Sequence, residues 1–323
     1  MTSNNTVFAI PEVRIFGATS YAVLCGFGLF ANILLLAVFV KGRSEYRQVP
    51  FFVIACQLML CDVVTHIVQF AIAVPITYTG RAIYGNSLLL HAPALCDTIA
   101  YNGTLLFSFL MTVNRITVFL LPHVHFKLFN RSSIVYTIGA VWLLVFVYVA
   151  ALNLDGCYKS FDSNGFFLFH DCSSRGGKGA LLLIGTTAST GLPIVMLCSY
   201  LLLFGVVRFS SKNAVRQNNR QREYSLLAQS FLICGFLEIQ NIAFTVLPMI
   251  QPGGQWNLVM NFLQNWISII NSTVNPIVYF TFNKGIRHRA MRLFGASTTY
   301  DFQRTNKVAT IAYATSRSTT RSR

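Results

Sequence analysis

The chain has 323 residues, of which 54% are hydrophobic and only 11% charged, and its formal net charge is +15. Soluble domains contain about 25% charged residues, so this composition excludes an ordinary soluble domain, a disordered chain and a collagen. The basic residues stand in short islands between long uncharged runs, so they do not form the continuous basic surface that nucleic acid requires. We therefore expect a protein that crosses a membrane several times and has no nucleic-acid partner.

Seven apolar runs are long enough to cross a bilayer, for which a helix needs about 20 residues. They are residues 15–40, the segment between Arg47 and Arg81, the segment that ends at Arg115, and residues 132–154, 179–207, 224–250 and 256–282. The runs are continuously apolar rather than alternating, so helices are expected rather than the strands of a barrel. The sequence predicts an all-α membrane protein whose seven-transmembrane helix bundle covers residues 15–282.

The basic residues are distributed unequally between the two sides of the predicted bundle. Twenty of the 25 Lys and Arg residues fall on one side, and five fall on the other. Because positively charged loops stay in the cytoplasm, we expect residues 1–14 to be extracellular and the C-terminus to be cytoplasmic, with the protein in the plasma membrane. Asn4 begins a glycosylation sequon in the extracellular segment.

Two short segments follow the seventh run. Residues 283–294 combine arginines with hydrophobic residues at helical spacing, which predicts a short amphipathic cytoplasmic helix lying on membrane lipid. Residues 295–323 are rich in Ser and Thr and have too little apolar surface to fold, so a disordered tail is expected.

Several motifs stand in a fixed order along the predicted spans. They are Gly28-Leu29-Phe30-Ala31-Asn32, Leu58-Met59-Leu60-Cys61-Asp62, Asn114-Arg115, Trp142, Pro193 and Asn275-Pro276-Ile277-Val278-Tyr279. In this order, over residues 15–294, the chain resembles a rhodopsin-like G-protein-coupled receptor. Asn114-Arg115 in place of Asp-Arg-Tyr, and the loop from Cys157 to Cys172, most resemble the nematode chemosensory serpentine receptors, class X among them.

The resemblance implies a chemoreceptor that converts binding of an extracellular small-molecule ligand into activation of a heterotrimeric G protein. Such a receptor is not an enzyme, and no paired aspartates, Gly-x-Ser-x-Gly or His-Glu-x-x-His pattern stands in the spans. A seven-span transporter or channel is the alternative, but the paired halves typical of transporters are not visible in the sequence. The resemblance also implies that phosphorylation of the tail recruits an arrestin.

The resemblance assigns a set of residues to G-protein coupling and switching. They are Asn114, Arg115, Pro122, Glu223, Asn275, Pro276 and Tyr279. Arg115 is expected to engage the G protein and to pair with Glu223 in the resting state, although Asn114 replaces the usual neighbouring acid. Pro276 removes a backbone N–H from the seventh span, so a bend is expected beside Tyr279.

Asp62 lies in the middle of a span, where an acid is costly unless it faces polar partners. The available partners are Asn32, Thr104, Asn271, Ser272 and Asn275. These positions match the sodium pocket of the receptor family, and oxygen ligands suit a hard monovalent cation. A water-filled polar core without an ion is the alternative, and no other metal or cofactor is expected.

A ligand site is expected nearer the outer end of the bundle. Its candidates are Asp97, Tyr101, Glu238, Asn241 and Trp266. Asp97 matches the position at which amine receptors hold the ligand's ammonium group. The alternatives are that Asp97 pairs with Arg81 or with a lysine of an outer loop, or that it forms hydrogen bonds within the bundle.

Two further features depart from the receptor pattern. Leu90 stands where the family places a bridging cysteine, so we expect a Cys157–Cys172 disulfide within the outer loop, with Cys96–Cys172 as the alternative. The sixth span reads Cys234-Gly235-Phe236-Leu237-Glu238 instead of Cys-Trp-x-Pro, so its mode of movement is not predicted.

Overall fold

The structure, a computed structural model, describes residues 10–85, 87–162, 166–172, 179–209, 217–250 and 256–294. Its helices are α1 (Pro11–Lys41), α2 (Arg43–Tyr46), α3 (Pro50–Val68), the π-helix η1 (Gln69–Ala73), α4 (Val74–Thr79), α5 (Leu88–Leu120), α6 (Pro122–Leu128), α7 (Ser133–Leu154), α8 (Ala180–Phe209), α9 (Gln217–Val246), the 3₁₀-helix η3 (Leu247–Met249), α10 (Trp256–Phe282) and α11 (Lys284–Leu293). The predictions for Asn4, the side chain of Glu223 and the tail 295–323 lie outside the described residues.

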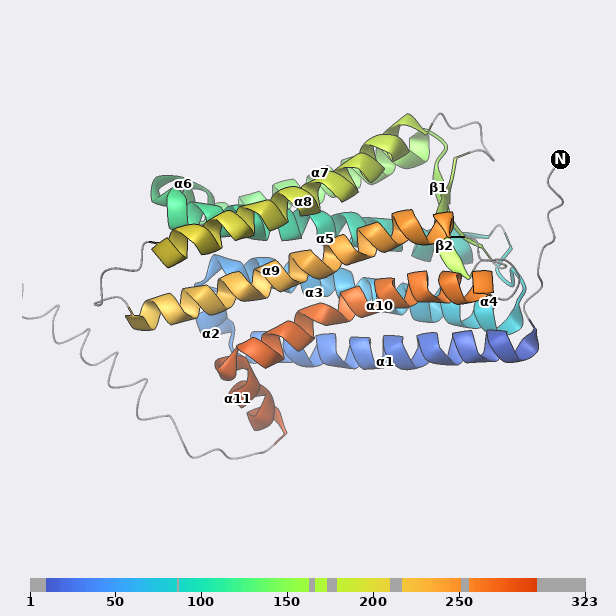
Figure 1. Ribbon diagram of the computed structural model, residues 1–323, viewed down its shortest axis with the longest axis horizontal. Coiled ribbons are helices and arrows are strands. Elements are labelled where there is room, and N and C mark those ends of the chain that lie inside the picture. The colour runs from blue at the N-terminus through green and yellow to red at the C-terminus, as the bar shows by residue number, and fades with distance from the viewer. Residues whose placement is uncertain are drawn as a thin grey trace, which may run out of the picture.

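Seven long helical segments form the predicted bundle, with α3, η1 and α4 joined into one segment (Figure 1). Six of them are long and apolar enough to cross a membrane within the described part of the chain, and α10 supplies 27 further helical residues. Helix α7 exposes Leu143, Phe146 and Val147 along its length. Exposed side chains of this kind suit a lipid-facing surface and not water.

The bundle has two distinct ends, which lie at opposite sides of Figure 1. One end carries a hairpin made of β1 (Tyr158–Asp162) and β2 (Phe167–Asp171), and the other carries α2, α6 and α11. These are called the hairpin end and the α11 end below. Helix α5 contacts α3, α7, α8 and α9, so it forms the centre of the bundle.

A proline explains the irregular course of the second segment. Pro75 has no N–H and cannot bond the carbonyl of Ala71 one turn earlier. The helix widens to a π turn there, and the Tyr84 hydroxyl donates to the Ala71 carbonyl over 2.8 Å. A side chain therefore satisfies the carbonyl that proline cannot bond.

The apolar pattern did not predict the hairpin. Its strands pair antiparallel from Tyr158 opposite Asp171 to Asp162 opposite Phe167. A disulfide between Cys157 and Cys172 closes the base of the strands. The preferred pairing is thus the one observed, and Cys96 is a free, exposed cysteine.

Phe166 anchors the tip of the hairpin inside the bundle. Its ring is buried and stacks on Phe262 of α10, with ring centroids 5.1 Å apart. The Tyr21 hydroxyl of α1 donates to the Phe166 carbonyl over 3.2 Å. Phe166 has a φ of 62°, a left-handed conformation that costs a non-glycine residue free energy. The ring stacking and the hydrogen bond hold the tip in that conformation.

Helix α1 can approach α3 and α10 closely because residue 28 is glycine. A Cβ atom at Gly28 would lie 2.3 Å from the His66 ring and 2.5 Å from the Thr273 hydroxyl. We expect Gly28→Ala to lower the free energy of unfolding by about 1–3 kcal/mol, because the neighbouring side chains must move apart. Thermal unfolding of the purified protein in detergent measures the change.

Gly26 provides the matched control, since a Cβ atom there would meet nothing within 4 Å. Gly26→Ala should leave stability unchanged or raise it by up to about 1 kcal/mol, because alanine favours the helix. Equal destabilisation by the two substitutions would contradict the close contact at Gly28.

Candidate functional site

A cavity of about 370 Å³ lies in the hairpin half of the bundle. The segment from α3 through η1, the helices α5, α7, α8, α9 and α10, and both hairpin strands contribute to its wall. Seven carboxamide side chains line it: Gln69, Asn102, Gln240, Asn241, Gln264, Asn265 and Asn271. Membrane helices carry so many amides at one place only where the amides face the protein interior or water, because lipid offers them no hydrogen bonds.

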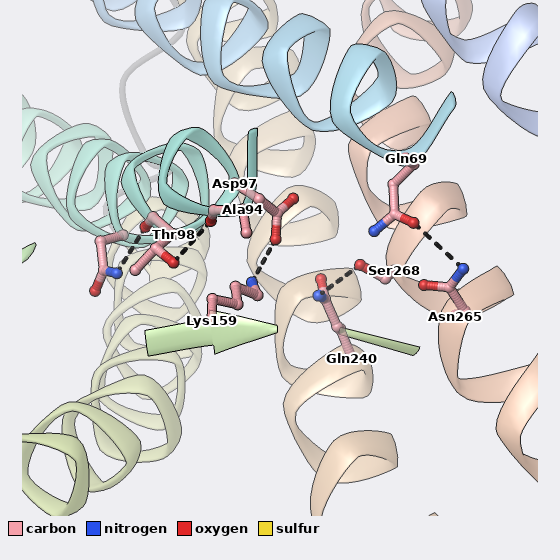
Figure 2. A network of polar contacts seen from close by, with 9 residues as sticks. Gln69, Ala94, Asp97, Thr98, Lys159, Gln240, Asn265 and Ser268 are labelled. Atoms are coloured by element: carbon pink, nitrogen blue, oxygen red, sulfur yellow. Dashed lines mark hydrogen bonds and ion pairs between the residues drawn. The ribbon is translucent and has the colours of Figure 1, made fainter. Parts of the chain in front are cut away.

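Asp97 in this cavity is neutralised by the hairpin. Lys159 of β1 reaches into the cavity and forms an ion pair with the Asp97 carboxylate of α5 (Figure 2). Only 12% of the Lys159 side chain and 7% of the Asp97 side chain are exposed. Asp97 is thus paired with a lysine of an outer loop, which is one of the alternatives to a ligand ammonium that the sequence left open.

Hydrogen bonds between amides join the cavity walls. Asn271 donates to Gln240 over 2.6 Å, and Gln240 donates to Ser268 over 3.3 Å. Asn265 donates to Gln69 over 3.3 Å, linking α10 to η1 (Figure 2). Each bond crosses between two helices, so the amides fix the spacing of the walls as well as their polarity.

Tyr101 and Asn241 lie together in the cavity. The Tyr101 hydroxyl donates to the Asn241 side-chain oxygen over 2.8 Å. Asn241 in turn donates to the Ser189 carbonyl over 2.5 Å. Three helices, α5, α9 and α8, are connected by this chain of hydrogen bonds.

The other two ligand candidates lie outside the cavity lining. Glu238 is buried in α9 with an oxygen that has no hydrogen-bond partner among the described residues. Trp266 faces α1, where its indole donates to Ser20 over 2.8 Å and its ring stacks on Phe262. Trp266 therefore points towards α1, whereas Glu238 stands one turn from Asn241 on the same face of α9, just beyond the lining residues.

His170 of β2 stands in the outer wall of the cavity beside Lys159. Burial lowers the pKa of His170 to about 3, with a further contribution from the Lys159 charge. The imidazole is therefore neutral at physiological pH. Within the described residues that line the cavity, Asp97 and Lys159 supply the charges, and these cancel.

The acid in the second span has the amide partner that the sequence suggested. Asn275 donates to the Asp62 carboxylate over 2.5 Å, and both residues are buried. Asn32 donates to the Ser272 carbonyl over 3.0 Å. The side-chain oxygens of Asn32 and Asn275 have no hydrogen-bond donor among the described residues. The site therefore retains oxygen atoms with unused lone pairs.

The remaining members of the expected ion pocket face the cavity. Thr104, Asn271 and Ser272 line it, and Asn271 is bonded to Gln240 rather than to Asp62. His66, one turn beyond Asp62 on the same face of α3, lies within 3.4 Å of the Thr273 hydroxyl. Sequence reasoning missed His66, although its spacing of four residues from Asp62 was a usable signal.

Arg115 is fully enclosed at the α11 end of α5, with 2% of its surface exposed. Its guanidinium lies 4.2 Å from the centre of the Phe51 ring, which is a cation–π distance. Tyr279 packs against the same ring, with centroids 6.0 Å apart. One aromatic ring thus connects Arg115 of α5 with Tyr279 of α10.

The other switch candidates lie around this contact. Asn114 is buried beside Arg115, and Pro122 occupies the first position of α6. Pro276 stands inside α10 directly after Asn275. The expected Arg115–Glu223 pair lies outside the described residues because the Glu223 side chain is not among them.

Helix α11 is attached to the first loop at this end. Arg289 forms an ion pair with Glu45, and its guanidinium lies 4.8 Å from the Tyr46 ring centre. Ile286 and Ala290, which are four residues apart on one face of α11, are buried. The predicted amphipathic helix is therefore present, with its apolar face against the bundle and an arginine bound to α2.

Comparisons with known proteins agree with this arrangement. The family model described as "Serpentine type 7TM GPCR chemoreceptor Srx" matches residues 23–283. G-protein coupled receptor 183-B of Danio rerio is 21% identical over 308 residues, which cover 88% of this chain and 81% of that protein. The crystal structure of squid rhodopsin superposes with a TM-score of 0.73 at 15% identity, covering 95% of this chain and 94% of that one.

The ion pair in the cavity has a measurable signature. Asp97→Asn leaves a buried Lys159 ammonium without its carboxylate, so we expect the free energy of unfolding to fall by about 3–5 kcal/mol. Adding Lys159→Met should recover most of that loss, because no uncompensated charge remains. Thermal unfolding of both single variants and the double variant measures the coupling, and purely additive losses would contradict the pair.

Proposed function

Because this chain belongs to the Srx family of serpentine seven-transmembrane G-protein-coupled chemoreceptors, we propose that its ligand is a small polar molecule without net charge. The cavity beneath the hairpin is the site. The observation that carries this proposal is the Asp97–Lys159 ion pair, which cancels the charges of the described lining residues. A charged ligand would have to break this pair or leave its own charge unmatched in the cavity.

The amides of the cavity favour a ligand with both donor and acceptor groups. Each carboxamide offers an oxygen acceptor and an N–H donor. Gln264 lines the cavity and has no hydrogen-bond partner within the described part of the chain, so its amide is available to a ligand. Tyr101 and Asn241 would then report ligand binding to α8 and α9 through the hydrogen bonds that they share.

The proposal places the hairpin end outside the cell and the α11 end in the cytoplasm of the plasma membrane. The disulfide at the hairpin end supports this, because disulfides persist in oxidising surroundings. Basic side chains gather at the opposite end, which supports a cytoplasmic location. They include Lys41, Arg43, Arg47, Lys127, Arg131, Arg287, Arg289 and Arg292.

A ligand that binds one arrangement of the helices more tightly shifts the population towards it. We place the coupling contact at the α11 end, where Arg115 and Tyr279 share the Phe51 ring. Separation of α5 from α10 would release Arg115 towards a G protein. In this proposal α11 lies on the inner lipid surface, phosphorylated tail residues bind an arrestin, and Asn4 is glycosylated.

A sodium ion at Asp62 is a further part of the proposal. The carboxylate and the unused oxygens of Asn32 and Asn275 are hard ligands of the kind that sodium accepts. Thr104 and Asn271 face the ligand cavity, so the set of protein ligands would be smaller than the sequence suggested. Water molecules would complete the coordination.

Coupling is tested by a screen of small uncharged compounds in cells that report G-protein activation. We expect Arg115→Ala to abolish the response to any compound that activates the parent receptor, while surface expression is kept, because the guanidinium no longer reaches the G protein. Arg131→Ala, at the same end but exposed, is the control and should retain the response. Full signalling by Arg115→Ala would exclude this role.

Sodium binding is tested by thermal unfolding in sodium chloride and in choline chloride at equal ionic strength. Sodium at ten times its dissociation constant should stabilise the parent protein by about 1.4 kcal/mol. Asp62→Asn should remove this difference, because the carboxylate is lost. Glu238→Gln, which neutralises another buried acid, should keep it. A sodium effect that survives Asp62→Asn would place the ion elsewhere.

A further inference from the structure

The outer wall of the cavity is fastened at three points, which limits access from the hairpin end. The Cys157–Cys172 disulfide closes the base of the hairpin, and Lys159 is paired with Asp97 in its middle. Phe166 is buried at its tip against Phe262. A ligand that arrives from water past the strands would have to displace a buried aromatic ring or a buried ion pair.

The wall formed by α8 is much thinner. The residues of α8 that line the cavity mostly have small side chains: Leu182, Gly185, Thr186, Ser189 and Thr190. Thr186 and Thr190 line the cavity and are nevertheless exposed, so the cavity reaches the surface of the protein along this helix. The neighbouring Leu183 and Ile184 are 68% and 61% exposed, as expected for side chains that face lipid.

The depth of this opening places it at the edge of the hydrocarbon. Helix α8 has 30 residues and is about 45 Å long, so it extends about 7 Å beyond a 30 Å core at each end. Gly185 stands five residues into the helix, about 7 Å from its start, and Ser189 is deeper. The opening therefore begins where the lipid chains begin.

Tyr148 of α7 stands across this opening. Its hydroxyl donates to the Leu181 carbonyl of α8 over 3.3 Å, and its side chain lines the cavity. A Cβ atom at Gly185 would lie 1.9 Å from the Tyr148 oxygen, so the tyrosine fits only because residue 185 is glycine. This single part-buried hydrogen bond contributes about 1 kcal/mol, so the side chain can rotate away at a small cost in free energy.

We propose that the ligand reaches the cavity from the outer lipid leaflet, between α7 and α8, with Tyr148 as the gate. The ligand class is thereby narrowed to uncharged molecules that dissolve in lipid and carry a hydrogen-bonding group. This inference rests on the proposed function for the existence of a ligand. The route itself is a property of the bundle and is tested without any ligand or G protein.

The test measures access to a cysteine on the far wall of the cavity. Gln264→Cys is introduced with Cys96→Ser and Cys198→Ser, which remove the exposed free cysteines of the described chain. The protein is reconstituted in phosphatidylcholine vesicles and treated with lipid-soluble N-phenylmaleimide or with a membrane-impermeant, positively charged methanethiosulfonate. Mass spectrometry of the peptide that contains residue 264 gives the rate of labelling.

We expect Tyr148→Ala to raise the rate of maleimide labelling several-fold and to leave the rate for the charged reagent unchanged. Adding Gly185→Leu to Tyr148→Ala should lower the maleimide labelling rate again, because the leucine side chain fills the opening. Tyr136→Ala, a substitution of an exposed tyrosine on the same helix, is the control and should change neither rate. If Tyr148→Ala does not yield folded protein, Tyr148→Phe removes the hydrogen bond alone and should give a smaller rise.

Two outcomes would overturn the inference. An equal rise for the charged reagent would show that water, and not lipid, reaches the cavity past Tyr148. An unchanged maleimide rate in folded Tyr148→Ala and Tyr148→Phe would show that the tyrosine is not the barrier. Loss of G-protein activation in the receptor assay would contradict the proposed function and leave these labelling rates unaffected.

Discussion

Lipid offers no hydrogen bonds, and under this constraint several buried polar side chains of the bundle pair with one another. Asp62 is bonded to Asn275, Tyr101 to Asn241, and Asn271 to Gln240. Each bond joins two helices, because an unpaired polar group in hydrocarbon costs several kcal/mol. The same bonds that let the helices cross the membrane therefore fix their relative positions, and a ligand that exchanges one of them changes helix packing directly.

The hairpin extends this logic to the mouth of the bundle. A carboxylate on α5 needs a cation, and Lys159 supplies it from a loop instead of a ligand. The lysine is held by a disulfide two residues before it and by an aromatic anchor at the hairpin tip. The ion pair thus has two effects. It holds the hairpin over the cavity, and it neutralises the carboxylate that would attract an amine.

The sequence predicted the parts of the structure that depend on local composition. Continuous apolar runs indicated the seven helical segments, and the acid in the second span indicated polar partners such as Asn275. The hairpin was missed because its strands lie in a short polar loop whose pairing depends on contacts with α1 and α10. Trp266 was assigned to the ligand site by depth, but a helix turns 100° per residue and depth does not specify the face, and the Trp266 indole is bonded to Ser20 of α1.

The strongest constraint on the ligand comes from combining the cover with the thin wall. A cavity whose charges cancel offers no unpaired charge to a charged ligand. A hairpin held by a disulfide, an ion pair and a buried ring limits entry from water. The α8 wall has the opposite properties, since Gly185 and Ser189 leave little side-chain volume between the cavity and lipid. The amides inside the cavity and the proposed route through lipid favour the same class of ligand, one that is soluble in the bilayer and able to form hydrogen bonds. Charge cancellation at Asp97 and the proposed access beside Tyr148 rest on separate observations, and each one favours a ligand of that class.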